Sequence, residues 1–157
     1  MAARSLRLVF CLLLLLSCAA TAGSVPQPGP KDKCPVCGMF VARYPEWSAS
    51  LTFNDGRSEF FDGVKDMLRF YHGLKRYAPR RRPAEIREMQ VKDYYSLAFV
   101  DAASAWYVIG SDVLGPMGKE AVPFRGESDA RSFLKDHHGT RILRFPELTP
   151  VIIKGLE

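Results

Sequence analysis

The order strand–strand–helix–strand is predicted twice along this chain, and that repeat limits the folds it can adopt. Asn54-Asp55-Gly56 is a strong hairpin-turn signal in the first pass, with an apolar run on each side. A Phe-Asp-Gly and a Phe-Arg-Gly segment stand in matching places before the two helices. The predicted strands are 47–53, 58–61 and 88–94 in the first pass, and 106–110, 119–124 and 140–145 in the second. The pattern predicts an α+β fold of two related ββαβ lobes with antiparallel sheets.

Each predicted helix carries one apolar face. Apolar residues recur at i, i+3, i+4 and i+7, the spacing of one side of an α-helix. They are Val64, Met67, Leu68 and Tyr71 in the first helix, and Ala130, Phe133, Leu134 and His137 in the second. We expect Asp62 and Ser128 to cap the N-termini of these helices, and Gly139 to end the second.

Residues 1–17 have the pattern of a secretory signal. Arg4 and Arg7 precede an apolar run at 8–16, which is shorter than the roughly 20 residues of a membrane-spanning helix. No other stretch of the sequence approaches that length. We therefore expect an exported, periplasmic protein.

Two cleavage sites can follow this signal. Ala20-Thr21-Ala22 fits ordinary cleavage, whereas Leu-Leu-Ser-Cys ending at Cys18 resembles a bacterial lipobox. We favour lipidation of Cys18, which ties the protein to a membrane surface. Residues 18–30 then form a Pro/Gly tether, and residues 31–157 form one domain.

The composition excludes several classes of protein. With 47% hydrophobic and 25% charged residues, the chain is neither disordered nor collagen-like. The formal net charge of +5 includes Arg4 and Arg7 of the signal. Without them it is about +3, too weak to indicate nucleic-acid binding. The basic run at 75–82 is typical of a solvated loop.

Four cysteines reduce to one pair in the mature chain. Cys11 lies in the signal, and Cys18 is lipidated or removed. Cys34 and Cys37 form a CxxC motif, which alone cannot supply the four thiolates of a zinc ribbon. A redox pair, a structural metal knuckle and a soft-metal site all remain open. The motif precedes a predicted strand at 40–42, whereas a thioredoxin-like motif opens a helix.

Methionines add a second soft donor. Met39 closely follows the CxxC motif, and Met117 lies in the turn Gly-Pro-Met-Gly, while Met67 and Met89 have positions that predict structural roles. Thiolate and thioether together favour Cu(I), but methionine is also a common core filler, so both roles stay open for Met117. His72, His137 and His138 lie near predicted helix ends, where histidines commonly have a structural role. One of them can still complete a three-coordinate copper site.

Several motifs together resemble the NosL family of copper-binding lipoproteins. The matching segments are Cys-Pro-Val-Cys-Gly-Met at 34–39, Phe-Asp at 61–62, Tyr-Val-Ile-Gly-Ser at 107–111, Gly-Pro-Met-Gly-Lys-Glu at 115–120 and the helix at 130–139. The resemblance spans residues 31–148 and implies a two-lobed fold similar to the metal-handling domain of organomercurial lyase. It implies a periplasmic Cu(I) chaperone. It also implies nitrous oxide reductase as recipient and the ABC transporter of its copper-centre assembly as partner.

The resemblance implies a ligand set as well. Cys37 and Met117 match the family pattern most directly, followed by Cys34 and Met39. Because Cys34 ends the tether, we expect it to be the flexible ligand that joins and leaves the site. A disulfide between the two cysteines would abolish binding.

The sequence does not indicate an enzyme. It contains no G-x-S-x-G, H-E-x-x-H or phosphate-binding glycine loop. We expect Asp62, Asp66, Asp112 and Glu120 at caps, turns or the surface. The alternatives are a periplasmic thiol–disulfide oxidoreductase, which needs both cysteines but not Met117, and a zinc knuckle that staples the fold.

Overall fold

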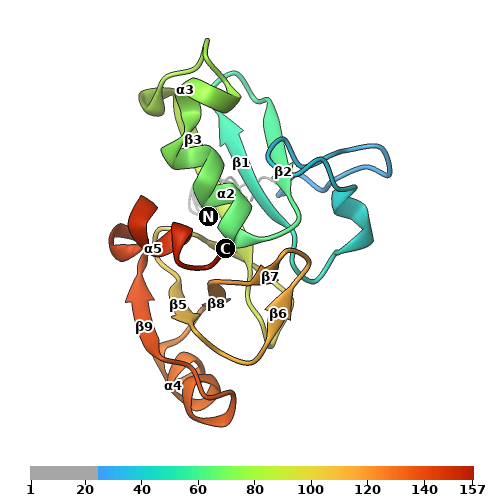
Figure 1. Cartoon of the computed structure of the whole chain (residues 1–157). Helices are drawn as coiled ribbons and strands as arrows, with labels where there is room; N and C mark the ends of the chain where they lie inside the picture. The colour runs from blue at the N-terminus through green and yellow to red at the C-terminus, as the bar shows by residue number, and fades with distance from the viewer. Residues whose placement is uncertain (1–24) are drawn as a thin grey trace, which may run out of the picture.

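The computed structural model describes residues 25–157 and has two lobes with a short hairpin between them (Figure 1). The predicted signal and the lipidation of Cys18 lie outside the described residues. Residues 25–30, the described part of the predicted tether, contain no helix or strand. Within residues 25–157, no helix is both long enough and apolar enough to cross a membrane.

The first lobe is an antiparallel sheet packed against a helix. Its strands are β1 (Ala49–Phe53), β2 (Ser58–Phe61), β3 (Ile86–Lys92) and β4 (Phe99–Asp101), and its helices are α2 (Val64–His72) and α3 (Leu74–Tyr77). The sheet order is β2-β1-β3-β4. Every residue of β1 is buried, because two strands flank it and α2 covers it. Two 3-10 helices complete the lobe: η1 (Val41–Arg43) precedes β1, and η2 (Pro83–Glu85) lies between α3 and β3.

The second lobe repeats this topology. Its sheet consists of β5 (Trp106–Ile109), β8 (Val122–Phe124) and β9 (Arg141–Arg144), and α4 (Glu127–Asp136) packs on it. The order β8-β5-β9 matches β2-β1-β3, since in both lobes the first strand is central. The predicted α+β fold of two ββαβ lobes is therefore confirmed.

Three short elements complete the chain. A hairpin of β6 (Leu114–Gly115) and β7 (Gly118–Lys119) is inserted between β5 and β8. After β9 come η3 (Phe145–Glu147) and α5 (Pro150–Lys154), and α5 packs against α2 of the first lobe. The larger hydrophobic core includes Tyr107, Leu143 and Leu148 beside the first-lobe residues, so it extends across both lobes.

Several local predictions were wrong. Residues 40–42 are not a strand, because Phe40 makes a single bridge to Lys33 and the chain then enters η1. The predicted strand at 119–124 is interrupted between β7 and β8. Neither predicted cap is used: Gly63 is the N-cap of α2, and Gly126 is the N-cap of α4.

Candidate metal centre

The CxxC motif forms a tight turn that holds both thiols on one side. The Cys34 N–H donates to the Met39 carbonyl at 2.8 Å, and the Gly38 N–H donates to the Cys34 carbonyl at 2.9 Å. Gly38 has a φ of +82°, a left-handed conformation that glycine adopts without steric cost. The bridge between Lys33 and Phe40 closes the turn at its base.

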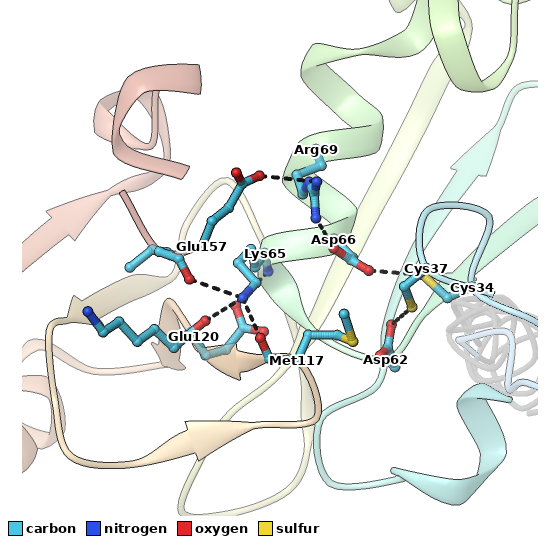
Figure 2. Close-up of polar contacts among 11 residues, drawn as sticks. Cys34, Cys37, Asp62, Lys65, Asp66, Arg69, Met117, Glu120 and Glu157 are labelled. Atoms are coloured by element: carbon cyan, nitrogen blue, oxygen red, sulfur yellow. Dashed lines mark hydrogen bonds and ion pairs between the residues drawn. The ribbon is translucent and has the colours of Figure 1, made fainter. Parts of the chain in front are cut away.

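Two carboxylates from the start of α2 face these thiols (Figure 2). The Cys37 thiol donates to Asp62 Oδ1 at 3.2 Å, and the Cys34 thiol donates to Asp66 Oδ2 at 3.4 Å. Asp66 lies in the first turn of α2, whereas Asp62 lies just before the extended N-cap residue Gly63, so the entry of the chain into the helix brings both carboxylates to the thiols. One donor atom from each of the four residues lies within 4.8 Å of the others. This spacing suits ligands around one metal ion.

Burial controls the protonation of the thiols. Cys34 is 2% exposed and Cys37 is half-buried. Burial raises the pKa of Cys34, backbone hydrogen bonds lower it and the Asp62 carboxylate raises it, and together they bring the pKa to about 12. Burial also raises the pKa of Cys37, as do Asp66 and Asp62 beside it. The thiols therefore stay protonated at neutral pH until a cation replaces their protons.

One carboxylate oxygen of the site has no hydrogen-bond partner in the described part of the chain. Asp62 is 1% exposed, and its Oδ2 has no hydrogen-bond partner among residues 25–157. Asp66, by contrast, forms an ion pair with Arg69 at 3.4 Å. An unpartnered buried carboxylate oxygen beside two thiols attracts a cation, because leaving it unpaired costs free energy. Both observations make the CxxC turn a candidate metal centre.

Met117 enters from the other lobe. It lies with Pro116 at the tip of the β6–β7 hairpin and is 43% exposed. In Figure 2 its side chain points toward Cys37 and Asp62. Its backbone carbonyl accepts a hydrogen bond of 2.7 Å from Lys65 Nζ on α2. The hairpin thus directs a thioether toward the two thiols.

The remaining candidate ligands have other surroundings. Met39 is half-buried, and its carbonyl serves the CxxC turn. His72 Nε2 lies 2.8 Å from the Leu148 carbonyl, and His137 Nδ1 lies 3.0 Å from Asp112. His138 is exposed. The four-residue cluster contains no histidine, and the structure brings none of these three to the CxxC turn.

Two expectations about the site were wrong. Cys34 is not a flexible ligand at the end of a tether; it is the more buried thiol and is fixed by the turn. Asp62 and Asp66 are not helix caps or surface groups, because both are buried against the thiols. Their signal in the sequence was the four-residue spacing, with Asp66 between the apolar positions Val64 and Met67.

Comparison with known proteins gives consistent matches. A family model described as NosL matches residues 25–153. The copper-binding lipoprotein NosL of Stutzerimonas stutzeri is 28% identical over 131 residues, which cover 78% of this chain. The chain spans only 65% of the length of that curated relative.

Two solved structures are also similar. The crystal structure of the copper chaperone NosL from Shewanella denitrificans matches with a TM-score of 0.68 and 24% identity, over 82% of this chain and 97% of that chain. The solution structure of apo-NosL from Achromobacter cycloclastes gives a TM-score of 0.47 and 25% identity, over 67% of this chain and 87% of that one. The first match supports the two-lobed fold.

Proposed function

Because this chain belongs to the NosL family, we propose that it is a copper chaperone that binds Cu(I) with the thiolates of Cys34 and Cys37 and the thioether of Met117. The observation that carries the proposal is the pair of thiols held close together, with the Met117 side chain of the other lobe pointing toward Cys37 in Figure 2. Thiolate and thioether are soft ligands, and this combination selects Cu(I) over harder cations. Met39 remains a fourth candidate ligand.

The difference in burial between the ligands suggests how copper leaves. Cys34 is the deepest ligand, whereas Cys37 is half-buried and Met117 is exposed. A soft ligand of an acceptor protein can therefore approach from the hairpin side and displace the thioether first. The thiolates then release the ion and regain protons. Cys34 is therefore the last protein ligand to leave the copper ion, whereas a flexible ligand would leave first.

The recipient and the location are part of the proposal. The S. stutzeri relative is named a copper-binding lipoprotein, which supports lipidation of Cys18 and a position on the periplasmic side of a membrane. We propose nitrous oxide reductase as the acceptor cuproenzyme, with the ABC transporter of its copper-centre assembly as partner. Transfer from the Cu(I)-loaded protein to purified apo-reductase and transporter tests this; a stable complex without transfer would point to another acceptor.

The site chemistry argues against a thiol–disulfide oxidoreductase. Reactive cysteines in such enzymes have a lowered pKa, because the thiolate is the attacking species. Here burial and the facing carboxylates raise the pKa of both thiols. Neither cysteine lies at a helix N-terminus. The catalytic alternative therefore has no support from this geometry.

Anaerobic competition for Cu(I) against a coloured chelator tests the ligand set. We expect Cys37→Ser and Met117→Leu each to weaken binding by at least about tenfold, a loss that even outer-shell changes produce in metal sites. Met89→Leu is the matched control, since Met89 lies on β3, where it pairs with Leu51 and packs against the hydrophobic core. Unchanged affinity in Met117→Leu would remove the thioether from the site and leave a CxxC–carboxylate centre.

A further inference from the structure

A buried lysine joins the metal-site helix to the hairpin of the other lobe. Lys65 is the second residue of α2 and is only 3% exposed. Its Nζ donates to the carbonyls of Met117 at 2.7 Å, Lys119 at 2.8 Å and Leu156 at 3.2 Å. An ammonium group has three donors, so every donor of Lys65 has an acceptor. Two of the three acceptors belong to the β6–β7 hairpin.

In a second contact between the same two segments, a side chain next to the hairpin reaches the backbone of α2. Glu120 follows the hairpin and is buried. Its Oε1 accepts the Lys65 backbone N–H at 2.6 Å and the Ala121 N–H at 2.9 Å. A Cβ on Gly63 would overlap Glu120 Oε2, so the glycine leaves room for this carboxylate at the start of α2. The segment from Met117 to Glu120 is therefore fixed to the first turn of the helix.

The two carboxylates of the candidate metal centre flank this start of α2. Asp66 directly follows Lys65, and Asp62 lies three residues before it. A hairpin whose strands have two residues each has little stability of its own, and the exposed Met117 side chain adds little packing. The contacts of Lys65 and Glu120 therefore restrain where the tip of the hairpin lies relative to α2, and the Lys65 side chain is the one that binds the Met117 carbonyl itself (Figure 2).

We propose that Lys65 is a positioning residue for copper binding: its three hydrogen bonds hold the hairpin so that the Met117 thioether faces the two thiols. The inference rests on the proposed function, because it matters only if Met117 is a copper ligand. The contact of Lys65 with the β6–β7 hairpin would then determine where the Met117 sulfur lies relative to the thiols. Lys65 itself does not touch the metal in this arrangement.

The test combines affinity with a signal from Met117 itself. We expect Lys65→Leu to weaken Cu(I) binding by roughly 10-fold to 100-fold, the range for outer-shell partners of metal ligands. In protein labelled with [¹³C]methyl-methionine, Cu(I) should shift the Met117 methyl resonance in the wild type but not in Lys65→Leu. Lys135→Leu is the matched control, because Lys135 is an exposed lysine on α4, away from the hairpin.

A double-variant cycle separates positioning from general damage. Added to Met117→Leu, Lys65→Leu should cause no further loss of affinity, since the ligand it positions is already absent. An equal loss in both backgrounds, or wild-type affinity in Lys65→Leu, would overturn the inference. If Lys65→Leu does not fold, Lys65→Gln, which keeps a donor at this position, takes its place in every comparison.

The proposed function fails in a different way. If Met117→Leu alone binds Cu(I) as tightly as the wild type, the thioether ligand is refuted, and the role of Lys65 is refuted with it. If Met117→Leu weakens binding and Lys65→Leu does not, only the inference about Lys65 fails. The two results are therefore distinguishable in one set of titrations.

Discussion

At the scale of single residues, each thiol of the cluster faces its own carboxylate. Cys34 donates to Asp66 and Cys37 donates to Asp62, so the metal-free site is a pair of neutral thiols beside two acidic side chains. The thiol protons occupy the position that a cation would take. Binding a metal exchanges protons for the ion, and the raised pKa values of the thiols make that exchange depend on pH.

We predict that the apparent Cu(I) affinity rises with pH between about pH 6 and about pH 8. The pKa of Cys34 is about 12, and that of Cys37 is raised by burial and the same carboxylates, so both thiols are protonated throughout this window. Each must lose its proton to bind, and log K should therefore increase by up to about two per pH unit. Competition titrations corrected for the protonation of the chelator measure the slope.

The control is Cys37→Ser, in which one ionising thiol remains and the slope should fall to about one. A flat profile in the wild type would mean that the thiols bind without losing protons or are already ionised. That outcome would contradict the raised pKa values of the site.

Residue types at the site were easier to predict from the sequence than their environment. Cys34, Cys37 and Met117 stand out because their spacing and turn context have few structural explanations. Asp62 and Asp66 were missed because carboxylates near a helix start usually act as caps. Their burial depends on where the CxxC turn packs, which is a tertiary property that local pattern does not contain.

At the scale of elements, the two helices of the repeat begin alike but are capped differently. Gly63 and Gly126 are the N-caps of α2 and α4, and neither helix start has a cap bond from its own N-cap side chain. The start of α2 instead receives the Glu120 carboxylate from the other lobe. A negative group at a helix N-terminus is favourable because it meets free N–H groups and the positive end of the helix dipole.

We predict that Gly63→Ala destabilises the fold by about 1–2 kcal/mol, the usual loss for a helix cap. The new Cβ would overlap Glu120 Oε2 and displace the carboxylate from the start of α2. Gly126→Ala is the matched control at the equivalent position, where a Cβ meets only Asp129 Oδ2, at an ordinary 3.7 Å. Urea unfolding of both variants measures the difference, and equal losses would contradict a cap supplied by Glu120.

The repeat was predictable because hydrophobic periodicity and turn residues are local signals. The turn at residues 54–56 and the apolar faces of both helices sufficed to give the order of elements. The capping prediction failed at Asp62 because Glu120 supplies the cap of α2. Its carboxylate accepts the backbone N–H of Lys65, which is 55 positions earlier in the sequence. A contact of that range cannot be inferred from residues near the helix.

At the scale of the whole molecule, the fold does not depend on the metal centre for its core. The fully buried side chains of the first lobe include Leu51, Phe53, Phe61 and Leu68, which come from β1, β2 and α2. The larger core also takes residues from the second lobe, so both lobes bury apolar surface together. The CxxC turn contributes one fully buried residue, Cys34, at the edge of this core.

We therefore predict that the metal-free protein remains folded and that Cu(I) adds stability without being required. At about 100 times its Kd, Cu(I) should raise the free energy of unfolding by at most about 2.7 kcal/mol, because copper also binds thiols of the unfolded chain. Anaerobic urea unfolding with and without Cu(I) measures the increment. Cys37→Ser should keep the fold and lose at least about half of the increment at the same Cu(I) concentration, since a tenfold weaker site has about ten times its Kd of copper. A metal-free protein that is unfolded by circular dichroism would instead indicate a structural metal knuckle, since a carrier has to survive the release of its ion.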